Sequence, residues 1–507
     1  MLPRFTWYDL RVVGHYLGVL ISFFSLALLL PLLTAVCMQE WEAASRYLLG
    51  AGLTLSLGSL MRMLRIEPGK LTQSQALAIT GFAWIILAVV AAVPLWLSGH
   101  YGSFLDALFE SVSALTTTGA TLVVDIEHMA YADNMWRFTM HFIGGLGLIV
   151  VALSLGLLGR GAWGMYLSEG RSDHVLPNVV STARLISRIA FLTIAIAVVI
   201  LTLCCLIAGM EPVRAFFHAL WVAVSGYMTA GFVPTSQSIM YYHSFPLEVV
   251  CIVLMVLGAI NFALLLEVWK GKTTAFFKDL EIRTAAIWLL VMCVVLVSSM
   301  SAAGLYSDLP TLLRRGVFML ISASTTTGFQ VVTNNQLVTV FSSGAILILA
   351  VVMAVGGSSG STSGGIKFLR IGLTTKAVVS SVKETLLPES ARASVIYNHL
   401  GKHVLTADNI KIATTVSALF IITYLIGALI GIAHGYDAVS AIFESVAMAS
   451  NGGLSSGIVS RGMPITLEVF YIIEMWAGRL EFIALLALFV KIVTSCIPRK
   501  KAGRDRK

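Results

Sequence analysis

Four short clusters rich in threonine, serine, asparagine and glycine recur along the chain, and each is centred on one glycine. These glycines are Gly119, Gly231, Gly328 and Gly453, separated by 112, 97 and 125 residues. Glycine adopts a positive φ readily, which lets successive backbone carbonyls point in the same direction. Rings of such carbonyls can replace the hydration shell of a monovalent cation. The clusters therefore indicate an uncharged cation-binding site made from four similar segments.

The similarity of the four segments extends beyond the glycines. An aromatic residue lies ten positions before each glycine, and a small residue lies six positions before it. Four unrelated glycine turns between helices are the alternative, but the shared register favours a repeated architecture. The predicted cation site consists of Thr116, Thr117, Thr118, Gly119, Met228, Thr229, Ala230, Gly231, Thr325, Thr326, Thr327, Gly328, Ser450, Asn451, Gly452 and Gly453.

A second candidate site is the run 356–367, which places five glycines and five serines or threonines inside an apolar stretch. Glycine and serine break helices and leave backbone groups that need polar partners. We expect a flexible loop that lies under the glycine clusters and obstructs the path, whereas a packing seam of small residues between helices is the alternative. A phosphate-binding loop is excluded, because Ile366 interrupts the required Gly-Lys pair. The predicted gate consists of Gly356, Gly357, Ser358, Ser359, Gly360, Ser361, Thr362, Ser363, Gly364, Gly365 and Lys367, together with Arg479.

Arg479 is the lone cation deep in the last apolar stretch. An arginine at membrane depth costs about 2.5–3.5 kcal/mol on insertion scales, and such residues usually face a cavity. Beneath a cation site it would repel the permeant ion and act as a barrier. The alternative is a structural ion pair with Glu474 or Glu481. Two further carboxylates, Glu110 and Glu444, occupy equivalent repeat positions, and we expect them to accept hydrogen bonds from backbone amides of the glycine segments.

Transition-metal chemistry has little support in the sequence. His399 and His403 have a helical i, i+4 spacing that suits Zn²⁺, but no third ligand lies nearby in the sequence. The six cysteines form no CxxC motif and suit small apolar core positions. We therefore expect no transition metal in this chain, and the glycine clusters remain the candidate site for a monovalent cation.

The composition places these candidate sites in a membrane. Of 507 residues, 57% are apolar and only 12% are charged, and the mean hydropathy is +0.88. Soluble domains are about 45–50% apolar and about 25% charged. These values exclude a soluble enzyme, a nucleic-acid-binding domain and a disordered chain. Long continuous apolar runs also argue against a β-barrel, whose strands alternate.

A membrane-spanning helix needs about 20 apolar residues, and the chain offers about ten such stretches. Four shorter stretches, 104–115, 215–227, 315–324 and 438–448, precede the glycine clusters and are too short to cross, so we expect them to dip into the membrane and return. The predicted spans are 12–36, 47–61, 71–97, 138–159, 189–210, 249–266, 284–306, 342–366, 412–433 and 465–495, of which 47–61 is the weakest.

With four returning segments, all thirteen lysines fall on one side of the membrane. The positive-inside rule makes this side cytoplasmic and places both termini there. The basic end 499–507 then serves first as a topology anchor. The other side carries an excess of carboxylates, which either concentrates cations at the entrance or simply keeps the loops soluble.

These expectations define the fold class and its organisation. The chain is predicted to be an all-α polytopic membrane protein with four pseudo-symmetric helix–pore loop–helix repeats around a central pore. Its predicted parts are an N-terminal two-helix addition (1–70), repeat 1 (71–170), repeat 2 (171–283), repeat 3 with the broken helix and a cytoplasmic segment (284–407), and repeat 4 with the basic end (408–507).

This pattern resembles the Trk/Ktr/HKT superfamily of potassium transport proteins across nearly the whole chain, and is most similar to the Trk-type uptake subunits. The four glycine clusters resemble the family's filter segments, and the two added N-terminal spans are similar to those that separate Trk from Ktr subunits. The other motifs that carry the resemblance are Gly144-Gly145-Leu146-Gly147, the broken-helix run from Gly357 to Lys367, and Gly478-Arg479-Leu480-Glu481.

The resemblance implies a K⁺-permeable homodimer in the bacterial cytoplasmic membrane, regulated by a cytosolic nucleotide-binding ring of the TrkA type. It implies neither a cofactor nor a nucleotide site in this chain, and no nucleic-acid partner. The segment 367–411 is then the best docking surface for the regulator, with an ordinary solvated loop as the alternative.

The expected function is K⁺ uptake through a channel-like subunit that is gated by the intramembrane loop and a cytosolic partner. The alternative is a secondary transporter that couples K⁺ to Na⁺ or H⁺. Such transporters typically have inverted repeats and an ionisable site at the midplane, whereas the repeats here are parallel and the glycine clusters are uncharged. An intramembrane enzyme lacks a nucleophile or metal constellation in this sequence.

Overall fold

The computed structural model describes residues 4–67, 71–147, 150, 153, 179–304, 308–339, 341–386 and 394–497. Within these ranges the chain is almost entirely helical, and its only sheet is the antiparallel hairpin of β1 (Ile396–Asn398) and β2 (Lys402–Val404). The all-α membrane fold predicted from the sequence is therefore confirmed. The end of the predicted span 138–159 and the basic end 499–507 lie outside the described residues.

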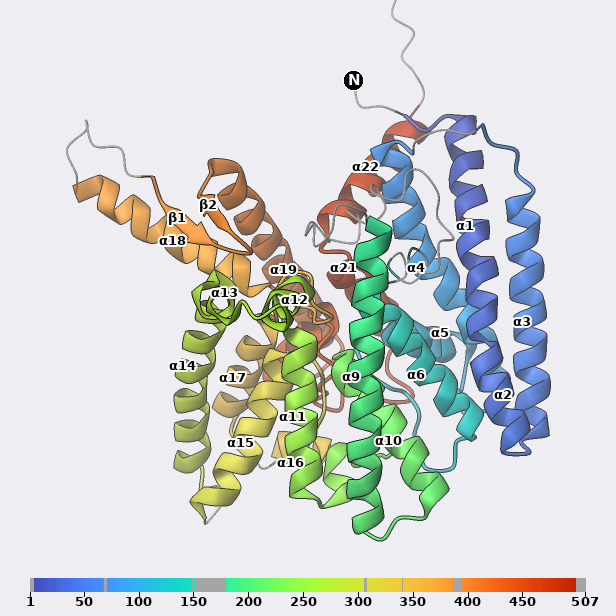
Figure 1. Cartoon of the computed structure of the whole chain (residues 1–507), viewed down its shortest axis with the longest axis horizontal. Helices are drawn as coiled ribbons and strands as arrows, with labels where there is room; N and C mark the ends of the chain where they lie inside the picture. Colours follow the sequence, from blue (N-terminus) through green and yellow to red (C-terminus); the bar gives the residue numbers. More distant parts are fainter. Residues whose placement is uncertain are drawn as a thin grey trace, which may run out of the picture.

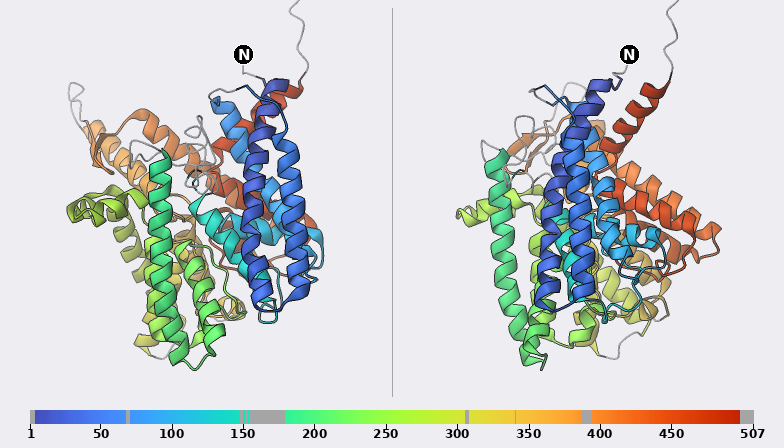
Figure 2. Two further views of the ribbon diagram at one scale, coloured as in Figure 1. Left: turned by 45° about the vertical axis from the view of Figure 1, so that its right-hand side comes forward. Right: turned by 90° about the vertical axis from the view of Figure 1, so that its right-hand side faces the viewer.

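Two N-terminal helical segments form a hairpin at the edge of the bundle (Figures 1 and 2). The helices α1 (Trp7–Ala27) and α2 (Leu29–Cys37) together make one apolar stretch of 31 residues. The helix α3 (Trp41–Arg62) runs back along this stretch in the opposite direction. The two legs approach closely, since a β-carbon on Gly58 would lie 2.6 Å from the backbone nitrogen of Ser22.

Repeats 1 and 2 each place a short helix between longer ones. In repeat 1 the order is α4 (Gln73–Trp96), α5 (Phe104–Leu115) and α6 (Tyr131–Leu146). In repeat 2 the elements are α9 (Val179–Ile207), α10 (Pro212–Tyr227), the 3₁₀ turn η1 (Ser238–Tyr242), α11 (Phe245–Ala259), α12 (Phe262–Trp269) and α13 (Thr273–Lys278). The short helices α5 and α10 lie where the sequence predicted returning segments.

Repeats 3 and 4 follow the same order. Repeat 3 contains α14 (Leu280–Ala302), α15 (Leu309–Ser324), α16 (Asn334–Thr339), α17 (Ser343–Ala354) and α18 (Phe368–Leu386). After the β-hairpin, repeat 4 contains α19 (Ala407–Ala433), α20 (Ala438–Ala449), α21 (Ile465–Arg479) and α22 (Ile483–Cys496). The remaining returning segments are thus α15 and α20, of 16 and 12 residues. We call α5, α10, α15 and α20 the pore helices.

Among the described residues, the helical stretch after the glycine cluster is interrupted in repeats 2, 3 and 4, which the sequence predicted only for the run 356–367. The pair α11 and α12 is bent by 106°, and α21 is separated from α22 by a break at Glu481 and Phe482, both with positive φ. The stretches 249–266, 342–366 and 465–495 are therefore not single spanning helices. Among the described residues, five helices are long and apolar enough to cross a membrane, or six if the bent pair counts as one.

Close approach to the pore helices accompanies these breaks. A β-carbon on Gly144 would lie 1.8 Å from the Leu115 carbonyl oxygen, and one on Gly478 would lie 1.9 Å from the Ala449 oxygen. In repeat 2, a β-carbon on Gly258 would lie 2.1 Å from the corresponding Tyr227 oxygen. The last carbonyl of a pore helix thus abuts a glycine of the following helix, and no side chain fits between them.

The described segments that carry lysines gather at one end of the bundle. The helix α18, the β-hairpin and the end of α22 lie in the upper part of Figure 1, as does the start of α1, and the loop around α13 lies below α18, nearer the middle of the bundle. The helix α16 and the start of α10 lie toward the opposite end. This arrangement agrees with the predicted segregation of charge, and we use the phrase lysine-bearing end for the upper end.

Candidate functional site: a ring of four glycine segments

Each pore helix ends in the same backbone structure. We call Gly119, Gly231, Gly328 and Gly453 the ring glycines. In each repeat, the backbone amide of the residue immediately before the ring glycine donates a hydrogen bond to the carbonyl of the small residue five positions earlier. The four bonds run from Thr118 to Ser113 (2.9 Å), from Ala230 to Ser225 (2.9 Å), from Thr327 to Ser322 (2.9 Å) and from Gly452 to Ala447 (2.8 Å). The small residues singled out by the sequence repeat are therefore the acceptors that end the pore helices.

The segments also share an unusual backbone conformation at two positions. Each ring glycine has a positive φ, with values of 81° at Gly119, 85° at Gly231, 89° at Gly328 and 63° at Gly453. The residue two positions earlier has a positive φ as well, although it carries a side chain. These residues are Thr117 (57°), Thr229 (48°), Thr326 (51°) and Asn451 (56°). Left-handed residues with side chains are strained and cluster at functional sites.

The four glycines converge and close a ring. A β-carbon on Gly119 would lie 2.1 Å from the Ala230 carbonyl oxygen, and one on Gly231 would lie 2.4 Å from the Thr327 oxygen. A β-carbon on Gly328 would lie 2.9 Å from the Gly452 carbonyl oxygen, and one on Gly453 would lie 2.0 Å from the Thr118 carbonyl oxygen. Each ring glycine therefore faces a carbonyl of the next repeat. This closed order leaves no space for any side chain at the four positions.

A cavity of about 100 Å³ adjoins the ring on the side reached by the segments after the glycines. All four ring glycines line it, and so does Asn334 at the start of α16, so it opens toward the end of the bundle away from the β-hairpin (Figure 1). Several hydroxyl and amide side chains line this cavity: Thr121, Thr235, Ser236, Ser238, Gln330 and Ser455. A vestibule lined by these polar groups can receive a partly hydrated cation.

Two buried carboxylates hold the segments of repeats 1 and 4, as the sequence predicted. Glu110 accepts hydrogen bonds from the Leu122 amide (3.1 Å) and pairs with Arg137 at 2.9 Å. Glu444 accepts from the Ser456 amide at 2.7 Å. Both amides lie three residues after the ring glycine. The carboxylates thus fix the backbone of the segments, and the charge of Arg137, which also lines the cavity, is neutralised by Glu110.

The pore helices direct their carboxyl ends toward the ring. Leu115, Tyr227, Ser324 and Ala449 each lie four residues before a ring glycine and at the end of a pore helix. The carboxyl end of a helix carries a partial negative charge of roughly half an elementary charge. Four such ends favour a cation near the ring without any ionised ligand, which suits weak and reversible binding.

The run 356–367 lies on the pore-helix side of the ring, opposite the cavity. Its Gly357 amide donates to the Ser324 oxygen at 3.3 Å, and its Gly364 amide donates to the Thr326 hydroxyl at 2.8 Å. We call this run the intramembrane loop. In repeat 2 the Thr362 hydroxyl lies 3.0 Å from the Thr229 hydroxyl.

The intramembrane loop also reaches repeat 4, since a β-carbon on Gly364 would lie 2.0 Å from the Ser450 carbonyl oxygen. The loop therefore contacts the residues that precede three of the four ring glycines. Its Lys367 ammonium donates to the carbonyl oxygens of Ser363 and Gly364, so that this cation is turned back onto the loop itself.

Arg479 joins the intramembrane loop to repeat 1. Its guanidinium donates to the Thr362 carbonyl oxygen at 2.7 Å and to the Gly144 carbonyl oxygen at 2.5 Å. The carboxylates considered as alternative partners have other contacts: Glu481 forms an ion pair with Arg370, and Glu474 accepts a hydrogen bond from the Ser445 hydroxyl at 2.7 Å. Together the loop and Arg479 span all four repeats beneath the ring.

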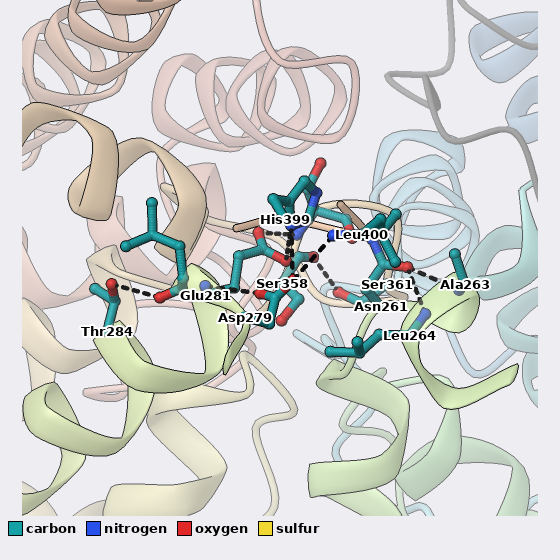
Figure 3. A network of polar contacts seen from close by, with 12 residues as sticks. Asn261, Ala263, Leu264, Asp279, Glu281, Thr284, Ser358, Ser361, His399 and Leu400 are labelled. Carbon is teal, nitrogen blue, oxygen red and sulfur yellow. Dashed lines mark hydrogen bonds and ion pairs between the residues drawn. The ribbon is translucent and has the colours of Figure 1, made fainter. Parts of the chain in front are cut away.

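Two residues that hold the intramembrane loop were not predicted from the sequence. The Asn261 amide donates to the Ser359 carbonyl oxygen at 2.6 Å, and the Glu281 carboxylate accepts from the Ser359 amide at 2.7 Å. Asn261 and Glu281 are labelled in Figure 3. Asn261 lies in the break between α11 and α12, where a polar residue after an apolar run was the available signal. Glu281 is fully buried at the start of α14, and its sequence neighbourhood resembles an ordinary solvated loop.

Comparisons with known proteins cover almost the whole chain. A family model described as TrkH, a cation transport protein, matches residues 45–496. The chain is 32% identical to the Trk system potassium uptake protein TrkH of Halomonas elongata, over 95% of this chain and 98% of the relative. It is 31% identical to an uncharacterized cation transporter of Methanocaldococcus jannaschii, over 96% of this chain and 97% of the relative.

A solved structure has the same fold. The crystal structure of the potassium transporter TrkH from Vibrio parahaemolyticus superposes with a TM-score of 0.80, covers 94% of this chain and 98% of that chain, and shares 24% sequence identity. At this identity the likeness shows the fold alone, and it includes nearly every element described above.

Proposed function

Because the chain belongs to the TrkH family of cation transport proteins, we propose that it carries K⁺ into the cell through the ring of four glycine segments. It is a membrane transport protein and not an enzyme. The potassium assignment draws on relatives that are named potassium uptake proteins. The observation that carries the pathway is the closed order of the ring, in which each glycine faces a carbonyl of the next repeat.

The ring suits K⁺ because its ligands are backbone carbonyls. The carbonyls of Thr118, Ala230, Thr327 and Gly452 face the neighbouring glycines, and carbonyl oxygens can replace the water around a monovalent ion. No ionised group is needed, since the pore-helix ends supply partial negative charge. A small cation such as Na⁺ is held more tightly by its water, so carbonyl coordination favours the larger ion.

The intramembrane loop and Arg479 act as the gate in this proposal. They lie across the pore-helix side of the ring and contact all four repeats. An ion that leaves the ring meets the loop and then the positive charge of Arg479. Conduction therefore requires that the loop move away from Thr326 and Thr229, the ring-segment residues that its Gly364 and Thr362 contact.

Regulation by a cytosolic partner completes the proposal. The helix α18 begins directly after Lys367 of the loop. It ends beside the β-hairpin at the lysine-bearing end (Figure 1). A nucleotide-binding ring of the TrkA type that docks on the segment 367–411 would pull on α18 and hence on the loop. We further propose a homodimer in the bacterial cytoplasmic membrane with both termini on the cytoplasmic side.

Reversal potentials test the proposal directly. Purified protein in a planar bilayer should give a reversal potential that approaches 59 mV for a tenfold K⁺ gradient, about the Nernst value for one charge. A matched pair of variants isolates the ring. A β-carbon on Gly453 would lie 2.0 Å from the Thr118 oxygen, whereas one on Gly457, which also has a positive φ, meets nothing within 4 Å.

Gly453→Ser should therefore reduce K⁺ current or K⁺ preference, and Gly457→Ser should retain both. Equal currents and equal selectivity in the two variants would contradict a pathway through the ring. A reversal potential that depends on both the K⁺ gradient and an imposed Na⁺ or proton gradient, in a fixed ratio, would favour a coupled secondary transporter.

A further inference from the structure

Three ligand-type side chains from two distant segments meet where the β-hairpin approaches the start of α14. Asp279 and Glu281 lie at the start of α14, and His399 lies in the turn between β1 and β2 (Figure 3). Their donor atoms all lie within 4.8 Å of one another. The His399 Nδ1 atom is 3.3 Å from an Asp279 carboxylate oxygen and 3.9 Å from a Glu281 carboxylate oxygen.

The spacing of these atoms fits a divalent metal ion. Zn²⁺ binds imidazole nitrogen and carboxylate oxygen at about 2.0–2.2 Å, and in a tetrahedral site this places neighbouring ligand atoms roughly 3.4 Å apart. The distances of 3.3 and 3.9 Å bracket that value. Two carboxylates and a neutral imidazole also balance the double charge of the ion, which matters because Asp279 and Glu281 are fully buried.

Surrounding contacts orient the three side chains. One carboxylate oxygen of Asp279 accepts a hydrogen bond from the Glu281 backbone amide at 2.8 Å, and the other accepts one from the Leu400 backbone amide at 3.3 Å. Glu281 uses one oxygen to accept the Ser359 amide at 2.7 Å and has its other oxygen toward His399. Metal ligands are commonly held by such outer contacts. Here one of them is the intramembrane loop.

We propose that Asp279, Glu281 and His399 bind a divalent transition-metal ion of the Zn²⁺ type, and that the bound ion holds Glu281 against the intramembrane loop. Binding ties three parts together: the start of α14, the β-hairpin and the loop. An occupied site keeps the Glu281 contact to Ser359 in place and so favours the closed loop. This effect on transport rests on the proposed function of the loop as a gate, whereas the binding of the ion does not.

The proposal replaces the expectation from the sequence that the chain holds no transition metal. That expectation weighed His399 with His403 at helical spacing. The structure places them on a hairpin instead, where His403 is exposed and its ring stacks on Tyr397 with centroids 5.6 Å apart. The carboxylate partners of His399 lie more than a hundred residues earlier in the chain, so no local spacing reveals them.

Metal binding is tested on the full-length protein, purified in detergent without a histidine tag. Co²⁺ is titrated while its visible absorption is recorded, and Zn²⁺ is then added in competition. We expect one equivalent of Co²⁺ to bind and Zn²⁺ to displace it. Asp279→Asn and His399→Gln should each weaken the affinity by at least about 100-fold, because loss of an outer contact alone costs 10–100-fold.

Two further variants separate the site from folding and from surface histidines. Glu281→Gln keeps an oxygen that can accept the Ser359 amide but loses the ligand charge, so it should fold and bind Co²⁺ weakly. His403→Gln on the same hairpin should bind like the unmodified protein. Equal Co²⁺ affinity in the unmodified protein and the three ligand variants would overturn the site and leave His399 as an ordinary ion-pair partner of Asp279.

Transport is measured on the same samples as K⁺ flux into proteoliposomes, with Zn²⁺ or a chelator present. Zn²⁺ should lower the flux of the unmodified protein and of His403→Gln several-fold, and it should not affect Glu281→Gln. Bound metal with unchanged flux would overturn the link to the loop. If the unmodified protein binds no metal and its flux still rises when the loop is deleted, the metal site is overturned and the proposed gate stands.

Discussion

Replacement of Arg479 by alanine removes both a charge and a tether beneath the ring. The guanidinium donates to Thr362 of the intramembrane loop and to Gly144 of repeat 1, at 2.7 and 2.5 Å. Alanine leaves these two carbonyls without this donor, and it removes a positive charge from the expected ion path. We therefore expect Arg479→Ala to increase K⁺ flux.

The size of the effect follows from two contributions. A hydrogen bond to a charged group contributes about 1.5–3 kcal/mol, so loss of the bond to Thr362 shifts the balance between closed and open loop by roughly 10- to 150-fold. Separately, two unit charges about 8 Å apart repel by roughly 2 kcal/mol at an effective dielectric of 20. Either contribution alone predicts an increase in flux of about tenfold or more.

Arg479→Lys separates the two contributions. Lysine keeps the charge but lacks the planar fork that reaches both carbonyls at once. If the charge dominates, Arg479→Lys should change the flux much less than Arg479→Ala, which is our expectation. If the tether dominates, the two variants should behave alike.

The assay is K⁺ flux per folded protein in proteoliposomes, with the melting temperature measured on the same preparation. Lower flux together with a lower melting temperature in Arg479→Ala would refute the barrier. Rescue of both by neutralising Glu474 or Glu481 would then establish a structural ion pair, because a stranded buried partner costs about 3–5 kcal/mol. The contacts of Glu481 with Arg370 and of Glu474 with Ser445 argue against that result.

Three other predictions concern the ring, the loop and a buried carboxylate. Gly119→Ser and Gly328→Ser should weaken the preference for K⁺ over Na⁺ or abolish flux, since each β-carbon would lie within 3 Å of a neighbouring carbonyl oxygen; wild-type permeability ratios in both would rule out the carbonyl ring. Deletion of residues 357–364 should raise flux and reduce its dependence on a cytosolic partner, whereas unchanged and still regulated flux from a folded protein would support the packing seam. Glu444→Gln should lower the free energy of unfolding by about 1–3 kcal/mol, as measured by denaturation, and reduce K⁺ preference, as measured by reversal potentials. Replacement of the exposed Glu42 by glutamine serves as the control. Equal values in the two variants would contradict the role of Glu444 in holding the segment.

Much of the architecture could be predicted because it repeats. Hydropathy and helix length separate spanning from returning segments, and the predicted stretch 104–115 coincides with α5 (Phe104–Leu115). Glycine at Gly119 and its three equivalents signals a backbone conformation that other residues avoid, and the structure has a positive φ at all four. Such properties belong to single residues or short segments, so they can be inferred without knowing what the segments contact.

The breaks in the helices that follow the glycine clusters could be seen only in the tertiary structure. The stretch 249–266 is uniformly apolar and predicts one span, yet the chain bends by 106° between α11 and α12. The bend comes directly after a contact with a distant segment, since Gly258 abuts the carbonyl of Tyr227 at the end of a pore helix. A contact between distant backbones leaves no signal in local hydropathy.

The partners of charged residues also depended on the fold. The sequence identified Arg479 as a buried cation and offered its nearest carboxylates as partners, but the guanidinium reaches carbonyls more than a hundred residues earlier. His399 likewise meets Asp279 and Glu281 through the docking of the hairpin on α14. Residue types, helix lengths and the fourfold repeat were determined by the sequence itself, because propensity and hydrophobicity act locally. Which charges meet was decided by packing between distant segments, because electrostatic and hydrogen-bond partners depend on distance in space and not on separation along the chain.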